Sequence, residues 1–221
     1  MSARAVSAYF FKLCAAFART ACLGTFFTFW TTISSYSGGF SRRELLMKPL
    51  LLTLALLWLL PVVSHASPEV GDTAPDFHLQ DQRGDWHRLA DYRGNWLVMY
   101  FYPKNDTPGC TTEACNFRDN LYLFERIGVD VVGVSLDDVE SHQAFAEKYQ
   151  LPFTLLSDNQ GNAARSYGVL AERGTTAFAR RETFVINPDG VVWKHYRNVN
   201  PDTHTDEVVA DLNQHFSNGA P

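Results

Sequence analysis

Two cysteines, Cys110 and Cys115, are the residues of this chain best suited to chemistry. They are the only two of its four cysteines that follow the leucine-rich segment near the N-terminus. The apolar run Trp96–Tyr102 precedes them, and its β-branched and aromatic residues predict a strand buried on both faces. We expect a helix to begin directly after this strand, because Thr107 favours an N-cap and Pro108 suits the first helical position.

Cys110 is therefore expected in the first turn of a helix that continues until Gly128. Apolar residues recur at helical spacing along it, namely Ala114, Phe117, Leu121 and Phe124. Free backbone N–H groups and the positive end of the helix dipole favour a thiolate over a thiol at such a position. Because the thiolate is the nucleophilic form of cysteine, this placement predicts sulfur chemistry at Cys110.

The spacing of the two cysteines does not suit a permanent cross-link. In a regular helix, a rise of about 1.5 Å and a turn of about 100° per residue put Cα atoms five positions apart at about 8.6 Å. A disulfide without backbone movement needs Cα atoms within about 7 Å. A Cys110–Cys115 disulfide therefore requires local unwinding, which suits a catalytic cycle. The alternatives are a structural staple in a surface loop and two idle thiols.

The first 66 residues differ in composition from the rest of the chain. They carry six basic residues and one acidic residue, whereas residues 67–221 carry 13 basic and 23 acidic residues, so the two net charges are +5 and −10. Residues 47–66 have the layout of a secretory signal: a basic start, 14 apolar residues and small residues before cleavage after Ala66. An uncleaved membrane anchor is the alternative, although the apolar stretch is shorter than the roughly 20 residues that span a bilayer.

Residues 1–46 receive no assignment from the sequence and are left out of the fold prediction. They are either the product of a mis-assigned start, with translation beginning at Met47, or an additional hydrophobic membrane segment. We expect an exported, periplasmic protein whose single folded domain is residues 67–221. Its net negative charge argues against nucleic acid and anionic membrane surfaces as partners.

Within this domain the pattern predicts an α/β protein with a thioredoxin-like fold, a three-layer α/β/α sandwich around a mixed central sheet. The turn at 188–190 joins two apolar runs into an antiparallel hairpin. Expected strands are 77–79, 86–89, 96–102, 129–136, 153–156, 183–187 and 191–197; expected helices are 108–127, 137–149, 163–167 and a closing helix after residue 202.

No metal site or cofactor is expected. The seven histidines form no ligand-spaced pair on any predicted helix. We interpret His142 and His195 as ordinary surface or strand residues. The acidic cluster at 137–140 is interpreted as a helix start, where its charges are favourable, rather than as a cation site.

The segment Tyr100–Asp119, which contains both cysteines, closely resembles the active-site segment of the peroxiredoxins, in particular the bacterioferritin-comigratory or peroxiredoxin Q branch. The resemblance extends over nearly all of residues 68–216. It includes Gly71–Phe77 at the start of the domain, Leu151–Asp158 in its middle and Arg181–Asn187 in a late strand.

This resemblance implies a thioredoxin-dependent peroxidase that reduces hydrogen peroxide and organic hydroperoxides. Cys110 would be the peroxidatic cysteine that becomes a sulfenic acid. Cys115 would resolve it to an intramolecular disulfide, which thioredoxin or a thioredoxin-like dithiol protein would reduce. Thr107 and Arg181 fall on the other two catalytic positions, and Pro103 on the proline that shields the thiolate. A monomer is expected, because one chain carries both cysteines.

Each of these roles has a competing interpretation. Thr107 is also explained as an N-cap alone, and Arg180 competes with Arg181, which we choose because it stands two residues before a Thr-Phe pair. Glu113 either positions Arg181 or stabilises the helix start, and it is kept outside the catalytic set.

Two other functions are considered for the whole domain. An exported thiol–disulfide oxidoreductase of the thioredoxin type would need a Cys-x-x-Cys motif, whereas four residues separate Cys110 from Cys115. A copper-binding module on the same fold would need a closer cysteine pair and an accessory histidine. His142 is the nearest downstream candidate, but no further ligand pattern surrounds it in the sequence.

Overall fold

The structure is a computed structural model that describes residues 67–219. The predicted signal peptide 47–66 and the extension 1–46 lie outside the described residues. The elements, in chain order, are β1 (His78–Asp81), β2 (Trp86–Arg88), the 3₁₀ helix η1 (Leu89–Tyr92), β3 (Trp96–Phe101), α3 (Pro108–Asp119), α4 (Leu121–Arg126), β4 (Val129–Ser135), α5 (Val139–Tyr149), β5 (Thr154–Ser157), α6 (Asn162–Ser166), β6 (Leu170–Arg173), β7 (Thr176–Ala179), β8 (Glu182–Ile186), β9 (Val192–Tyr196) and α7 (His204–Ser217).

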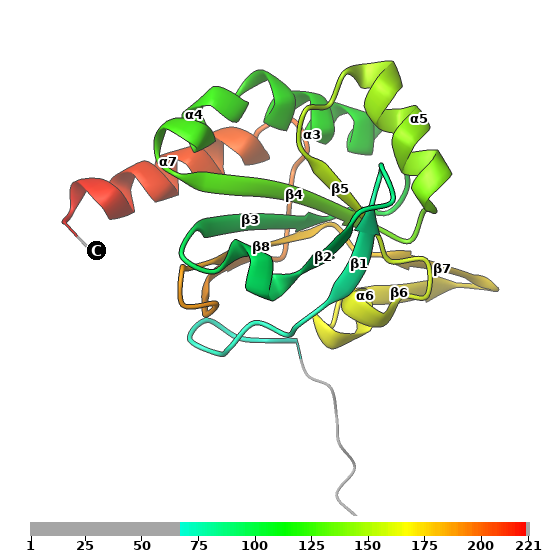
Figure 1. The fold of residues 1–221 in the computed structure, drawn as a ribbon, viewed down its shortest axis with the longest axis horizontal. Helices are drawn as coiled ribbons and strands as arrows, with labels where there is room; N and C mark the ends of the chain where they lie inside the picture. Colours follow the sequence, from blue (N-terminus) through cyan, green and yellow to red (C-terminus); the bar gives the residue numbers. More distant parts are fainter. Residues whose placement is uncertain (1–66, 220–221) are drawn as a thin grey trace, which may run out of the picture. The chain divides into compact units, whose positions relative to one another are not determined.

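A seven-stranded mixed sheet in the order β2-β1-β5-β4-β3-β8-β9 forms the middle of the domain (Figure 1). Strand β3 pairs in parallel with β4, which pairs in parallel with β5, whereas β8 runs antiparallel to both β3 and β9. This arrangement confirms the predicted mixed α/β fold, including the late hairpin. The carboxyl end of β3, whose residues are all buried, leads through the loop 102–107 to the cysteine helix, so a buried strand of the sheet positions the site.

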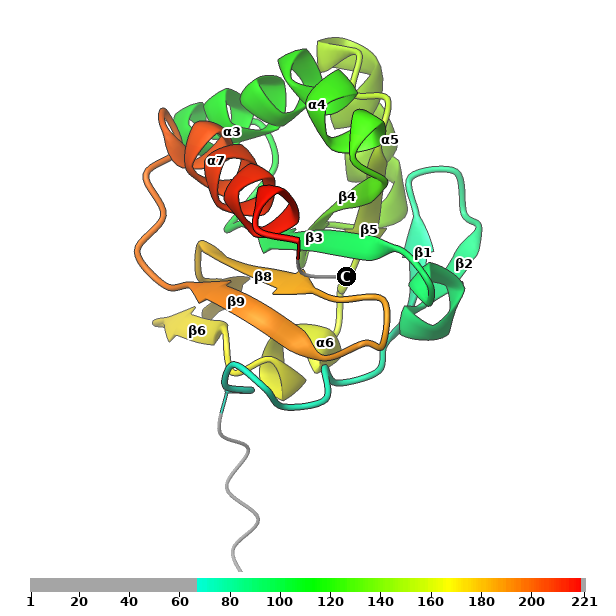
Figure 2. The same ribbon diagram turned by 90° about the vertical axis from the view of Figure 1, so that its left-hand side faces the viewer.

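Side chains of β3 alternate between two apolar cores, one on each face of the sheet. Val98, Tyr100 and, directly after the strand, Tyr102 pack with α3, α4, α5 and α7, while Leu97, Met99 and Phe101 pack on the opposite face. Figures 1 and 2 show α3, α4, α5 and α7 above the sheet and the short α6 below it. The second helical layer of the sandwich is therefore thin, and the N-terminal segment 74–79 completes that core.

The expected single helix from residue 108 to 127 is wrong, because it is divided into α3 and α4. Asn120 stands between them with non-helical angles, φ −106° and ψ 7°. Its side-chain amide donates to the carbonyl of Asn116 at 3.0 Å, which is the local competition with the backbone ladder typical of asparagine. The active-site helix α3 is consequently a short unit of 12 residues.

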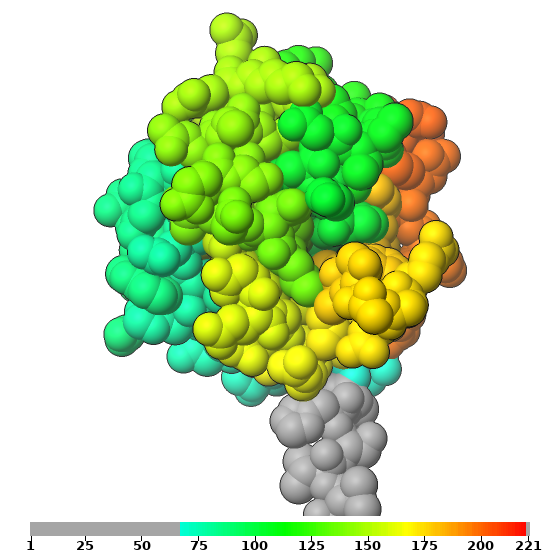
Figure 3. Space-filling view, turned by 90° about the vertical axis from the view of Figure 1, so that its right-hand side faces the viewer, coloured from blue at the N-terminus to red at the C-terminus, as the bar shows by residue number. Residues whose placement is uncertain are grey.

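The sequence did not predict the hairpin β6–β7, which forms a separate two-stranded sheet. Its strands contain Ala, Glu and Arg, which are poor strand formers, and most of its residues are exposed. The hairpin lies on the face shown in Figure 3, in yellow to gold. None of the helices within residues 67–219 has the length and apolar character needed to cross a membrane.

Candidate active site

Cys110 lies in the first turn of α3, at the point where the chain leaves the centre of the sheet. Its side chain is 1% exposed. Thr107 occupies the N-cap position and Pro108 the first helical position, as the sequence predicts. The thiol is therefore held at a helix start, where the N–H groups of the first turn favour negative charge.

The loop between β3 and α3 is held by a buried polar network. The hydroxyl of Tyr102 donates to Asn105 Oδ1 at 2.8 Å and lies 3.2 Å from His142 Nδ1. Asn105 in turn donates its side-chain amide to Ser141 Oγ and its backbone N–H to Asp137, both at 2.9 Å. This network fixes the loop against the start of α5.

The expectation that His142 and His195 are ordinary surface or strand residues holds only for His195, which lies in β9 beside Glu182. His142 is fully buried in α5, where its Nδ1 lies against the hydroxyl of Tyr102. Burial lowers the pKa of His142 to about 4, although Asp137 opposes this shift. The ring is thus neutral at physiological pH and serves as a polar partner inside the core.

Arg181 stands directly before β8, the strand that pairs with β3, and its side chain reaches the sulfur of Cys110. Its Nη2 donates to Sγ at 3.1 Å, and its Nη1 donates to Oε2 of Glu113. Burial disfavours a charged guanidinium, but Glu113 and Cys110 raise the pKa of Arg181 above its ordinary value. The site therefore holds a permanent positive charge in contact with sulfur, which stabilises a thiolate.

Glu113 was kept outside the catalytic set on the sequence alone, but the structure places it against Arg181. It lies one helical turn after Cys110, is fully buried and forms an ion pair with Arg181. Burial raises the pKa of Glu113 to about 7, although Arg181 opposes the shift. Its spacing of three residues from Cys110, which puts both on one helix face, is the sequence signal that could have included it.

The neighbouring Arg180 points to a different partner. It donates to Glu182 at 2.7 Å and to the carbonyl of Gly168 at 2.5 Å. The structure thus brings Arg181, and not Arg180, to Cys110.

The structure places Thr107 and Pro103 in the loop that leads to α3. The Thr107 hydroxyl donates to the carbonyl of Lys104 at 3.0 Å and does not cap the helix. Pro103 is half-buried, two residues after the end of β3. Among the described residues, no hydrogen bond joins the side chain of Thr107 to Cys110. Thr107 and Pro103 therefore shape the loop that leads to Cys110 and do not contact its sulfur through a hydrogen bond.

Gly109 allows the close approach of Arg181 to the helix. A Cβ at this position would lie 3.3 Å from Arg181 Nη2 and 3.4 Å from Cγ of Pro201. The glycine therefore leaves space for the guanidinium beside Cys110. Its role was not foreseen from the sequence, because only the tertiary contact requires it.

Cys115 is half-buried and lies in the same helix as Cys110, and both thiols are free. Arg118 lies one turn after Cys115, and its pKa is raised by Asp119, with a further contribution from the thiol of Cys115. Since α3 is continuous between the two cysteines, they stand apart as a regular helix requires.

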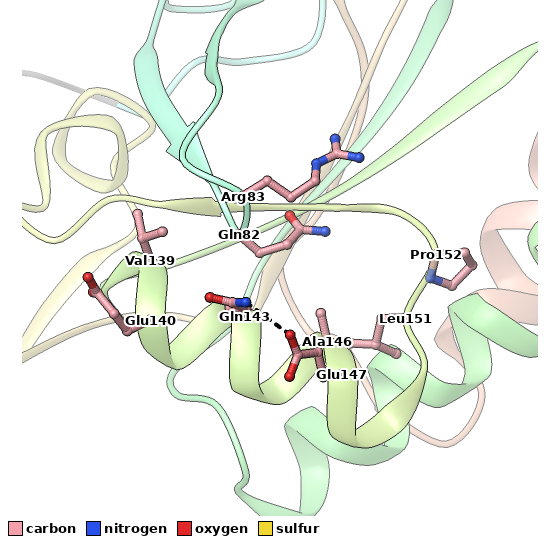
Figure 4. A pocket seen from close by; sticks show the side chains of 9 residues that line it. All are labelled: Gln82, Arg83, Val139, Glu140, Gln143, Ala146, Glu147, Leu151 and Pro152. Atoms are coloured by element: carbon pink, nitrogen blue, oxygen red, sulfur yellow. Dashed lines mark hydrogen bonds between the residues drawn. The ribbon is translucent and has the colours of Figure 1, made fainter.

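A pocket lies on another side of the domain, between the β1–β2 turn and the outer face of α5 (Figure 4). Gln82 and Arg83 line it on one side, and Glu140, Gln143 and Glu147 on the other. It includes none of the candidate site residues. Within residues 67–219 no cluster of three or more histidine, cysteine or acidic side chains could hold a metal ion.

The chain is similar to known proteins over most of the described domain. The AhpC/TSA family matches residues 70–195. A protein of Coxiella burnetii named "Putative peroxiredoxin bcp" is 43% identical over 150 residues, which are 66% of this chain and 99% of that protein. The chain belongs to the AhpC/TSA family and is a peroxiredoxin. The chloroplastic peroxiredoxin Q of Sedum lineare is 46% identical over 140 residues, covering 63% of this chain and 75% of the relative.

Solved structures of peroxiredoxins agree with this membership. A cysteine-to-serine mutant of Xylella fastidiosa PrxQ matches with a TM-score of 0.65 and 34% identity, covering 68% of this chain and 99% of that structure. Xanthomonas campestris peroxiredoxin Q matches with a TM-score of 0.62 and 36% identity, covering 69% and 99%. This peroxiredoxin is therefore a thiol peroxidase with a thioredoxin-like fold, and neither the thioredoxin-type oxidoreductase nor the copper module is supported.

Proposed function

We propose that this peroxiredoxin reduces hydrogen peroxide and organic hydroperoxides with Cys110 as the peroxidatic cysteine. The observation that carries the proposal is the 3.1 Å contact between Arg181 Nη2 and Cys110 Sγ at the start of α3. The thiolate attacks the terminal oxygen of the peroxide, the O–O bond breaks, and the leaving oxygen takes a proton to become water or an alcohol. The Arg181 guanidinium stabilises negative charge along this path, and the sulfur becomes a sulfenic acid.

The second step uses Cys115 as the resolving cysteine. Its thiolate attacks the sulfenic sulfur of Cys110, the S–O bond breaks, and hydroxide leaves as water after taking a proton. Since both residues lie in α3, the helix must unwind between them before the sulfur atoms can meet. An external dithiol protein of the thioredoxin type then reduces the disulfide by two exchange steps and leaves oxidised.

We also propose that the cycle runs in an exported, periplasmic and monomeric protein. The leader composition supports export, and the presence of both cysteines in one chain supports a cycle that needs no second subunit. Cleavage after Ala66 is checked by sequencing the N-terminus of the mature protein, which is expected to begin at Ser67. A mature chain that begins before Met47 would exclude the mis-assigned start.

Single-cysteine variants test the two thiol roles. Reduced protein is mixed with excess hydrogen peroxide, and peroxide consumption is followed with a recycling dithiol. Cys110→Ser is expected to abolish catalysed consumption, so a wild-type rate in that variant would overturn the proposal. Cys115→Ser is expected to form one sulfenic acid and then stall, overoxidise or accept an external thiol, which mass spectrometry detects as the corresponding mass change.

A further inference from the structure

The connection between β9 and α7 lies against the helix that contains both cysteines. Figure 2 shows this connection rising along the left-hand edge of the view to the start of α7, beside α3. The side-chain amide of Asn116 donates to the carbonyl of Pro201 at 2.9 Å. A Cβ at Gly109 would lie 3.4 Å from Cγ of the same proline.

Pro201 therefore meets α3 at two places that flank the reacting residues. Gly109 directly precedes Cys110, and Asn116 directly follows Cys115. The two are seven positions apart, which is about two turns, so both lie on the same face of the helix. The connection thus spans the part of α3 that lies between the thiols.

Disulfide formation requires the backbone between the two cysteines to leave its helical path. Because Asn116 is the neighbour of Cys115, rotation of the Cys115 backbone displaces the amide from Pro201. The C-terminal end of α3 is anchored separately: Phe117 is fully buried and stacks on Tyr100 at 4.7 Å. Unwinding is therefore confined to the turns that Pro201 covers.

We propose that Asn116 is a positioning residue that holds α3 folded through Pro201 and thereby sets the rate of disulfide formation. This proposal rests on the proposed function, since it concerns the step in which Cys115 attacks oxidised Cys110. With the hydrogen bond in place, the part of α3 between the two cysteines stays folded after Cys110 has been oxidised. The bond must break before resolution, so it slows the second step and prolongs the sulfenic acid.

Two substitutions of Asn116 give graded effects. Asn116→Ala removes the donor, and Asn116→Asp keeps the shape but sets a carboxylate oxygen against the carbonyl of Pro201. We expect disulfide formation to accelerate about two- to tenfold in the alanine variant, and further in the aspartate variant. Asn120→Ala is the matched control, because that amide, from the residue that ends α3, donates to the Asn116 carbonyl of α3 and not to a distant segment.

Rapid mixing with peroxide followed by acid quench and mass spectrometry separates the two steps. In both Asn116 variants we expect sulfenic acid to form at the wild-type rate and the disulfide to form faster. Because the sulfenic acid then lasts for a shorter time, a higher peroxide concentration is needed to overoxidise Cys110 to the sulfinic acid. Equal or slower disulfide formation in both variants, with sulfenic acid still forming, would overturn this proposal and leave the proposed function intact. Failure of the wild type to form any sulfenic acid at Cys110 would instead overturn the proposed function.

A second measurement needs no peroxide chemistry. Amide hydrogen exchange in a Cys110→Ser background is expected to show faster exchange over residues 110–117 in Asn116→Asp than in Asn120→Ala, with β3 and β4 unchanged. Equal exchange over residues 110–117 in both variants would contradict the role of the Pro201 contact.

Discussion

One guanidinium nitrogen of Arg181 lies 3.1 Å from the sulfur of Cys110, although the two residues are 71 positions apart in the chain. Strand β8 brings them together, because it pairs antiparallel with β3 and places Glu182 opposite Phe101, at the end of β3 from which the cysteine helix begins. The same guanidinium also binds the buried carboxylate of Glu113. A sulfur, a cation and an acid thus form one connected group at the end of the central strand.

Replacing Arg181 tests whether its forked guanidinium, and not simply a positive charge, supports the reaction. We expect Arg181→Lys to lower the rate of Cys110 oxidation by roughly 100-fold or more, since a lysine has one nitrogen in place of the two that contact carboxylate and sulfur in a fixed plane. The rate is measured by rapid mixing with hydrogen peroxide. Arg180→Lys is the control, because that residue binds Glu182 and the Gly168 carbonyl instead. Similar losses in both variants would contradict a specific role for Arg181.

Glu113 is expected to give the peroxide reaction a pH dependence near neutrality. Burial raises its pKa to about 7, so below that pH the carboxylate takes up a proton and holds Arg181 less firmly. We expect the rate of Cys110 oxidation to fall as the pH is lowered through about 7. In Glu113→Gln the rate is expected not to fall as the pH is lowered through about 7. If the variant showed the same fall, the titrating group would be a residue other than Glu113.

The stability of the protein is expected to depend on neutral His142. Its pKa is lowered to about 4 in the folded state, against an ordinary value of 6.5. Between these two pH values the unfolded chain binds the proton more readily, so the free energy of unfolding decreases as the pH falls from about 6.5 to about 4. Urea unfolding should show a smaller decrease in His142→Gln, which does not titrate in this range. Parallel curves for the two proteins would rule out this contribution.

Gly133 in β4 is expected to be required for packing against the sheet neighbour Tyr100. A Cβ at residue 133 would lie 2.7 Å from the hydroxyl oxygen of Tyr100 and 2.8 Å from Cδ2 of Leu155. We expect Gly133→Ala to lower the free energy of unfolding by about 1–3 kcal/mol through overpacking. The double variant Gly133→Ala with Tyr100→Phe removes one of the clashing atoms and should recover part of the loss. No recovery would place the strain at Leu155 and at Cζ of the residue 100 ring, which would lie 2.8 Å from the added Cβ and remains in the phenylalanine variant.

Local patterns predicted the elements that carry the chemistry. The apolar run before the cysteines is β3, the Thr107-Pro108 pair opens α3, and Asp138 caps α5 by accepting the N–H of Ser141 at 2.8 Å. The late antiparallel hairpin also follows the sequence prediction. These features depend on side-chain alternation, proline geometry and capping groups, which act between residues close together in the chain.

Features that depend on distant neighbours were missed or wrong. The break at Asn120 was missed because Phe117 and Phe124, on either side of it, lie in one core and continue the apolar spacing of a single helix. The burial of His142, the close approach at Gly109 and the hairpin β6–β7 also depend on surrounding segments. A sequence read in short windows carries no information about which of these segments meet.

The sequence by itself determined that Cys110 lies at the start of a helix after a buried strand. It also determined that Cys115 follows five residues later, a spacing at which a regular helix keeps the two cysteines too far apart for a disulfide. Only the tertiary structure decided which arginine reaches the sulfur, that Glu113 is buried against it, and that Pro201 lies over the helix between the thiols. The physical reason is that helix starts and spacing follow from local backbone geometry, whereas charge pairs and close contacts form between segments joined only by the folded sheet.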